Sequence, residues 1–188
     1  MRKPAAHVGL PQDRIWWTSF DSPIGRLHAL ASAQGLWRVT FRIPDESAFE
    51  RFQNETTLPI ERNEAGLADT QADLLALLVG SLPQVRMPFD LGDMRPFQKR
   101  VLEETQAIKR GQVLTYGDIA LRVGLPGAAQ AVGQALGHNP LPIVIPCHRV
   151  IAAKGDLGGF TGGLPTKVEL LTLEGVALPQ NQPRLDFQ

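Results

Sequence analysis

The chain contains a single cysteine, Cys147, which is followed directly by His148 and Arg149. A thiolate is the nucleophilic form of cysteine, and a neighbouring imidazole or guanidinium favours that form by lowering the thiol pKa. A lone cysteine is more often a small buried apolar residue, so its two neighbours carry the argument. The tripeptide indicates nucleophilic chemistry at Cys147.

The segment around the cysteine must turn if its neighbours are to act together. Successive residues of an extended strand point to opposite faces, so Cys147 and His148 can share a site only at a bend, with a water between them. Pro146 fixes its own φ angle and favours such a bend. Asn139, followed by Pro140, is a second turn signal, although it is equally typical of an ordinary loop.

Composition limits the other kinds of chemistry. One cysteine excludes an intramolecular disulfide, and His7, His28, His138 and His148 do not have metal-ligand spacing. No apolar run reaches the roughly 20 residues of a membrane span, and residues 1–11 lack the apolar core of a secretory signal. We therefore expect a cytoplasmic protein with no metal, no cofactor and no membrane contact.

The net charge is zero, but the charges are unevenly distributed. Residues 1–94 contain 9 Lys and Arg against 12 Asp and Glu, a net of −3, whereas residues 95–188 contain 10 against 7, a net of +3. A mildly basic C-terminal half is compatible with contacts to phosphates, although such a split is common among enzymes.

The elements that would position Cys147 follow from the hydrophobic pattern. Strand-like segments and two amphipathic segments in the first half predict a small α+β domain. The strands are expected at 14–20, 26–31 and 36–41, and the helices at 44–53 and 69–82. The second half is mostly helical, with helices expected from 96, at 116–123, 128–136 and 165–174, and a buried strand or extended run at 141–145. The short Gly-containing turn at 124–127 predicts a helix-turn-helix.

These patterns predict an α+β protein with two domains. The first, residues 1–88, should hold an antiparallel sheet. Three prolines in residues 82–96 indicate a connector, placed at 89–95. The second domain, residues 96–188, should carry Cys147.

Several motifs of the second half together resemble one family, the methylated-DNA–protein-cysteine methyltransferases (O6-alkylguanine-DNA alkyltransferases). The string PCHRV, preceded by NPLPIVI, carries most of the resemblance. The motifs RPFQKRVL, GQVLTYGDIA, GDLGGFTGG and LLTLEG accompany it in the family's order across residues 95–178. The first half agrees in its DSPIG turn. The resemblance implies a ribonuclease-H-like N-terminal domain and a winged-helix-like C-terminal domain.

The resemblance also implies roles for particular residues. Cys147 would accept an alkyl group irreversibly from O6-alkylguanine in DNA, once per molecule; whether O4-alkylthymine also reacts is left open. His148 would act as a base through a water, and Glu174 would orient its ring. Tyr116 would supply a proton or hydrogen bond to the leaving base. From its turn signal alone, Asn139 is expected to hold the shape of the cysteine segment.

Further residues are implied to bind double-stranded DNA, with the protein acting as a monomer. The helix at 128–136 would enter the minor groove, where small residues such as Ala129 and Gly133 permit close approach; without the resemblance, its small residues would indicate a tightly packed core helix. The damaged base would leave the stack and enter the site. Phe160 and Thr161 would lie in a lid over that base. Arg149 and Val150 are expected to contact DNA or substrate.

One position departs from the family pattern. Gln130 stands where the family usually has an arginine that fills the gap left by the flipped base. The change predicts weaker duplex binding with a smaller salt dependence. It also keeps open an alternative function, a lesion-binding sensor with weak alkyl transfer. A cysteine hydrolase would need an oxyanion hole, to which no motif points, and a neutral Ala- and Gly-rich helix is poorly suited to reading bases in the major groove.

Overall fold

The N-terminal part forms a three-stranded antiparallel meander whose strands are mostly buried. In the computed structural model, which describes residues 12–177, the strands are β1 (Ile15–Ser22), β2 (Gly25–Ser32) and β3 (Gly35–Phe41). The predicted DSPIG turn joins β1 to β2. In it the Ser22 hydroxyl donates to the Gly25 carbonyl at 2.6 Å, and Gly25 has a φ of 97°, an angle at which glycine carries no steric penalty.

A fourth strand, β4 (Ile60–Arg62), extends this sheet in the order β3-β2-β1-β4. It pairs with β1 in parallel, unlike the other strands. Its three residues are too short to show alternation, so the hydrophobic pattern did not predict it.

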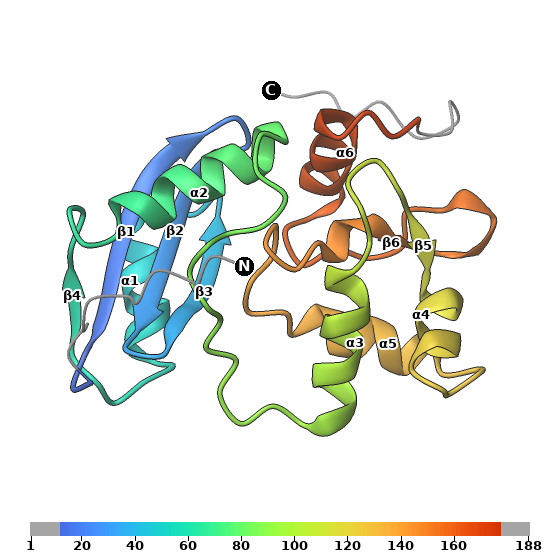
Figure 1. Ribbon diagram of the computed structural model, residues 1–188, viewed down its shortest axis with the longest axis horizontal. Coiled ribbons are helices and arrows are strands. Elements are labelled where there is room, and N and C mark those ends of the chain that lie inside the picture. The colour runs from blue at the N-terminus through green and yellow to red at the C-terminus, as the bar shows by residue number, and fades with distance from the viewer. Residues whose placement is uncertain (1–11, 178–188) are drawn as a thin grey trace, which may run out of the picture. The chain divides into compact units, whose positions relative to one another are not determined.

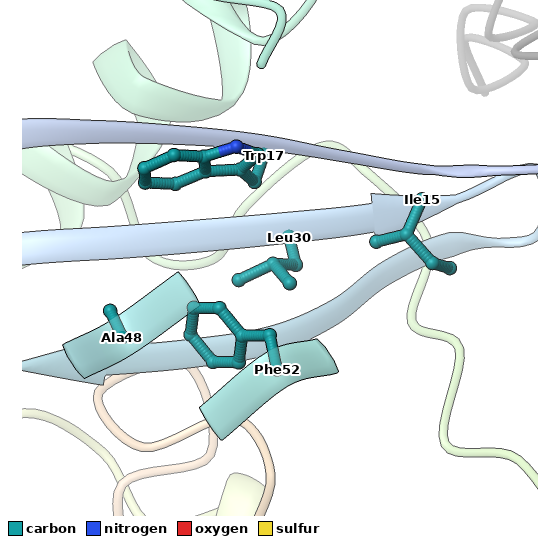
Figure 2. Packing of buried hydrophobic residues seen from close by; sticks show 5 residues of the cluster. All are labelled: Ile15, Trp17, Leu30, Ala48 and Phe52. Carbon is teal, nitrogen blue, oxygen red and sulfur yellow. The ribbon is translucent and has the colours of Figure 1, made fainter. Parts of the chain in front are cut away.

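Two helices cover opposite faces of the sheet, α1 (Asp45–Gln53) and α2 (Ala68–Val79) (Figure 1). Figure 2 shows how α1 packs: Ala48 and Phe52 lie against Ile15, Trp17 and Leu30 of the sheet. Full burial of an Ile, Leu or Phe side chain contributes about 1.5–3 kcal/mol, and this burial holds α1 to the strands.

The connector after α2 docks on the free edge of β3. The Leu36 amide donates to the Pro88 carbonyl at 2.8 Å, and the Asp90 amide donates to the Leu36 carbonyl at 2.9 Å. Glycine is required at position 35, because a Cβ there would lie 2.1 Å from the Pro88 oxygen. The proline-rich segment thus covers a strand edge that would otherwise expose unpaired backbone groups.

The described chain divides into two units, residues 12–93 with 140–144, and residues 94–139 with 145–177. The sequence-based division had assigned residues 140–144 to the second domain. They join the first unit, in which the Val39 amide donates to the Pro140 carbonyl at 2.9 Å. The predicted strand or extended run at 141–145 is wrong: the segment is buried but turns, with Ile143 at a φ of 77°. Pro140 and Pro142 lack the N–H groups that a strand ladder needs.

The second unit is mostly helical (Figure 1). Its helices are α3 (Pro96–Gln106), α4 (Tyr116–Arg122), α5 (Ala129–Gly137) and α6 (Leu164–Leu173), with short 3₁₀ turns η1 (Cys147–Arg149) and η2 (Ala153–Gly155). Two-residue strands, β5 (Leu114–Thr115) and β6 (Val150–Ile151), pair in parallel.

The helix α4 begins with a capping box. The Thr115 hydroxyl accepts from the Asp118 amide at 3.1 Å, while the Asp118 carboxylate accepts from the Thr115 amide at 2.8 Å. These bonds satisfy backbone donors at the helix start. They fix the first turn, which contains Tyr116. Helices α4 and α5 pack together and are joined by residues 123–128. The mixed α+β class is confirmed, whereas the helix-turn-helix assignment of this pair stays a prediction.

Candidate active site

The predicted bend at Cys147 is present. Pro146 has φ −80° and ψ 65°, and the Cys147 amide donates to the Ile145 carbonyl at 2.8 Å, closing a three-residue turn. A single 3₁₀ turn, η1, then carries Cys147, His148 and Arg149. The reversal removes the geometric objection that neighbours on an extended strand face opposite ways.

Asn139 holds this turn from outside it. Its Nδ2 donates to the Ile145 carbonyl at 2.8 Å and to Sγ of Cys147 at 3.2 Å. Cys147 is 7 % exposed. Burial raises its pKa, and the bond from Asn139 acts in the opposite direction by stabilising the thiolate. Asn139 is therefore a direct partner of the sulfur.

His148, next to the cysteine, is tied to the end of α6. Its Nε2 lies 3.1 Å from Oε1 of Glu174, although the two residues are 26 apart in sequence. Arg149 binds the same carboxylate through two hydrogen bonds. Its Nε donates to Oε2 at 2.8 Å and an Nη donates to Oε1 at 2.7 Å. Arg149 also donates to the Ile108 carbonyl at 2.5 Å. The buried carboxylate is thus held by a histidine and a bidentate arginine.

The charges of this cluster determine which imidazole nitrogen is free to accept a proton. Burial opposes ionisation of Glu174, but the bonds from His148 and Arg149 prevail and bring its pKa to about 2. Burial lowers the pKa of His148, so the ring is neutral near pH 7. An ionised Glu174 can only accept, which places the imidazole proton on Nε2. Nδ1 is then the basic nitrogen; it is buried and has no hydrogen-bond partner within residues 12–177.

A cavity of about 830 Å³ opens beside the sulfur. Cys147 lines it together with Tyr116 of α4, and the small residues of α5 contribute another part of the wall. The other lining residues expected from the sequence are Ala129, Gln130, Gly133, Phe160 and Thr161. The structure therefore brings these residues to one cavity.

Tyr116 fits between α5 and the loop that follows β6. A Cβ at Gly158 would lie 2.8 Å from Cε2 of the Tyr116 ring, and one at Gly133 would lie 3.7 Å from Cε1. The Tyr116 hydroxyl donates to the Gly159 carbonyl at 3.1 Å. Burial, and to a lesser extent Cys147, raises the tyrosine pKa, so the hydroxyl keeps its proton.

The hydroxyl of Thr161, in the loop that follows β6, makes a similar bond. Thr161 Oγ1 donates to the Gly137 carbonyl, at the end of α5, at 3.2 Å. The Phe160 ring meets the His148 ring edge-on, with 6.5 Å between ring centroids. Residues 159–161, part of the loop predicted to form a lid, line the wall of the cavity.

Two residues expected to contact DNA or substrate lie elsewhere. Arg149 is buried and its guanidinium is engaged by Glu174 and the Ile108 carbonyl, while Val150 is fully buried; neither lines the cavity. We correct that expectation. Arg149 neutralises the buried carboxylate and Val150 belongs to the short strand β6.

Sequence reasoning missed Lys167, which is 0 % exposed. A signal was present, because Lys167 is three and four residues before the buried Leu170 and Leu171 on the same helix. A lone charge in an apolar helix stripe is rarely buried without a partner.

In the part of the chain that the structure describes, no group of three His, Cys, Asp or Glu residues could hold a metal ion. Nor is any helix of residues 12–177 long and apolar enough to cross a membrane.

This unit combines a buried cysteine, a neutral histidine next to it and an adjoining cavity, an arrangement suited to nucleophilic chemistry at the sulfur. Comparison with known proteins identifies the class. Residues 96–176 match the family model of the 6-O-methylguanine DNA methyltransferase DNA-binding domain. A methylated-DNA–protein-cysteine methyltransferase of Mycolicibacterium paratuberculosis is 41% identical over 160 residues, covering 85% of this chain and 92% of that protein.

Solved structures agree. Mycobacterium tuberculosis OGT, crystallised in complex with DNA, is similar with a TM-score of 0.71 and 34% identity, covering 85% of this chain and 93% of that one. The O6-methylguanine-DNA methyltransferase of Pyrococcus kodakaraensis gives a TM-score of 0.69 at 26% identity, over 86% and 99% of the two chains.

The chain belongs to the methylated-DNA–protein-cysteine methyltransferase family. The family resemblance seen in the sequence and the enzyme class that it implied are confirmed. DNA repair by alkyl transfer, with DNA as the partner, is the general function that follows from membership.

Proposed function

We propose that the protein removes the alkyl group from O6-alkylguanine in double-stranded DNA and transfers it irreversibly to Cys147, once per molecule. The observation that carries this proposal is the position of Sγ, which borders the cavity and accepts from Asn139 while His148 presents a neutral imidazole from the next residue. Family membership supports the same chemistry.

The transfer is a direct substitution at carbon. The thiol proton passes to Nδ1 of His148 through a water, and the thiolate attacks the alkyl carbon bonded to guanine O6. The C–S bond forms as the C–O bond breaks, and the electron pair of that bond remains on the guanine. A proton from the Tyr116 hydroxyl neutralises the base and improves it as a leaving group, and the charge left on Tyr116 is balanced by the proton that His148 has taken up. The thioether product resists hydrolysis, so each molecule acts once.

Tyr116 and Thr161 are the donors we assign to the guanine. Both hydroxyls now donate to backbone carbonyls, of Gly159 and Gly137. A base in the cavity would offer ring nitrogen and O6 acceptors in exchange for those carbonyls. The exchange leaves no buried donor unpaired, which keeps the free-energy cost of admitting the base small.

Helix α5 is the element we assign to the minor groove, with the protein acting as a monomer in the cytoplasm. Ala129 and Gly133 line the cavity and bear small side chains or none, which allows a nucleic-acid backbone to come close. The flipped base would enter the 830 Å³ cavity from this side. Flipping costs a few kcal/mol, less for a damaged pair.

The test is mass spectrometry of the intact protein and its peptides after mixing it with an equal amount of duplex carrying one O6-methylguanine. We expect at most one methyl group per molecule, on the peptide that contains Cys147, and none in a Cys147→Ser control. Methyl transfer that continues past one equivalent would contradict the single-turnover reaction. The same assay with a duplex carrying O4-methylthymine determines whether that lesion also reacts.

A second candidate is a lesion-binding sensor that transfers alkyl groups weakly. The observation that favours it is Gln130, an uncharged side chain that is exposed on α5 and lines the cavity. Tighter binding of O6-methylguanine duplex than of plain duplex, without methylation of Cys147, would select the sensor.

A further inference from the structure

Lys167 is a charged residue in the second unit that neither the proposed reaction nor the sequence motifs use. It lies in the second turn of α6 with 0 % of its surface exposed. Burying an ammonium group is costly unless every N–H finds an acceptor. Such a residue needs an explanation.

The ammonium binds three backbone carbonyls of one segment. Nζ donates to the carbonyls of Val150 at 2.6 Å, Leu157 at 2.5 Å and Gly159 at 3.3 Å. An ammonium has three N–H donors, and all three are directed to the chain between β6 and the lid. Lys167 therefore connects the two ends of the loop formed by residues 150–159.

The same group is coupled to Tyr116. The Gly159 carbonyl that accepts from Lys167 also accepts from the Tyr116 hydroxyl at 3.1 Å. Nζ also lies 5.9 Å from the centre of the tyrosine ring, within the range of a cation–π contact. The Gly159 carbonyl and the Tyr116 ring thus connect the Lys167 ammonium to Tyr116, the side chain that we propose donates to the guanine.

We propose that Lys167 is a positioning residue for alkyl transfer: its ammonium group holds the backbone of residues 150–159 in place, and through Gly159 it sets the position of Tyr116 at the cavity. The expected effect on the transfer rate rests on the proposed function. The claim that Lys167 holds residues 150–159 in place does not depend on that function. Lys167 does not line the cavity, so it acts through the loop and the tyrosine.

The electrostatic surroundings make this role dependent on pH. Burial lowers the pKa of Lys167 to about 8, while Cys147 of η1 and Asp156 of the loop act to raise it. His148 and Tyr116 are the other titratable groups near it. A neutral amine has two N–H donors for three carbonyls, so deprotonation above pH 8 should loosen the loop.

The experiment compares Lys167→Met, Lys167→Arg and the control Lys109→Met, an exposed lysine outside the cavity. Hydrogen exchange of the DNA-free proteins reports on residues 150–161. We expect faster exchange there in Lys167→Met, with α3 and α5 unchanged. The methyl-transfer rate at saturating DNA should fall about a hundredfold, the loss expected when a reacting geometry shifts by about 1 Å. Lys109→Met should match the wild type in both.

The pH profile separates positioning from general stability. Above pH 8 the wild type should lose protection in residues 150–161, whereas Lys167→Arg, which stays charged, should not. If Lys167→Met does not fold, the wild type and Lys167→Arg carry the test. Equal loosening of α3, α5 and the loop, or a loop whose protection is independent of both substitution and pH, would overturn the proposal. Loop loosening in a wild type that transfers no methyl group would refute the proposed function alone.

Discussion

Asn139 donates one side-chain NH₂ group to two acceptors, the Ile145 carbonyl at 2.8 Å and Cys147 Sγ at 3.2 Å. The two bonds serve different ends. The bond to Ile145 fixes the turn that precedes Cys147. The bond to Sγ stabilises the thiolate and so opposes burial, which raises the thiol pKa. One residue thus joins the shape of the segment to the reactivity of the sulfur.

Replacing this amide should affect stability and reactivity together. In Asn139→Ala the free energy of unfolding should fall by about 1–3 kcal/mol, because the Ile145 carbonyl loses its partner. The pKa of the Cys147 thiol should rise further, which would be measured from the pH dependence of its alkylation by iodoacetamide. Asn63→Ala, at a partly exposed asparagine that accepts from the Gly66 amide, is the matched control. An unchanged thiol titration would exclude the role of Asn139 at the sulfur.

Glu174→Gln should lower both the stability of the protein and the ability of His148 to act as a base. The carboxylate accepts from His148 and from both branches of Arg149, so its neutral replacement leaves a buried guanidinium without a counter-charge. The cost is about 3–5 kcal/mol of stability. The transfer rate should fall by about 10²–10⁴, because the imidazole loses the partner that keeps Nδ1 unprotonated. Glu103→Gln, at an exposed position of α3, controls for the loss of one charge. A methyl-transfer rate in Glu174→Gln equal to that of the wild type would show that the Glu174 carboxylate is not needed for the reaction.

Acid should weaken the second unit through the same pair. The pKa of Glu174 is about 2, against an ordinary 4.5, so its stabilisation is present above pH 4.5 and is lost as the pH falls toward 2. The lowered pKa of His148 acts in the same direction, because below pH 6.5 the unfolded state binds the proton more readily. Urea unfolding between pH 7 and 3 should show wild-type stability falling with pH, and a shallower fall below pH 4.5 in Glu174→Gln. Parallel curves for the two proteins would contradict this assignment.

The parts of the fold that were predictable are those in which local pattern decides the structure. Strand-like segments bounded by turn signals indicated β1 to β3, and Thr115 marked the start of α4. The parallel strand β4 and the turn at 141–145 depend on tertiary pairing and on proline, which alternation does not capture.

At the site, adjacency pointed to Cys147 and His148, but their remote partners could not be derived from local pattern. Glu174 is 26 residues from His148 and was reached only through the family resemblance. Lys167 binds carbonyls, which no side-chain motif identifies.

Two neighbouring glycines of the lid should respond differently to alanine. Gly158 has a φ of 63°, and a Cβ there would lie 2.8 Å from the Tyr116 ring, whereas a Cβ at Gly159 would meet nothing within 4 Å. Gly158→Ala should therefore displace Tyr116, lower the transfer rate at saturating DNA and cost about 1–3 kcal/mol of stability. Gly159→Ala should leave both close to wild type. Thermal unfolding and single-turnover rates measured on the pair test this, and equal effects would show that the ring and loop adapt freely.

Gln130→Arg should strengthen DNA binding and raise its salt dependence. Gln130 is exposed and lines the cavity on α5, which carries no Lys or Arg. One added cation that neutralises a phosphate steepens the slope of log K against log salt by about 0.9. Gln134→Arg, one helical turn further along α5 and also at the cavity, adds the same charge and is the matched control.

The two variants differ in what they should do to the reaction. Both arginines should raise the salt slope, because the counterion effect depends on charge. Only the one at position 130 should increase the methyl-transfer rate, because only there would the side chain replace the flipped base in the stack and keep the lesion extrahelical. Fluorescence anisotropy at several salt concentrations and single-turnover methylation of Cys147 measure the two effects. A wild-type protein that already binds undamaged duplex with a steep salt dependence would contradict the premise, and equal rate gains in both variants would show that charge alone limits transfer.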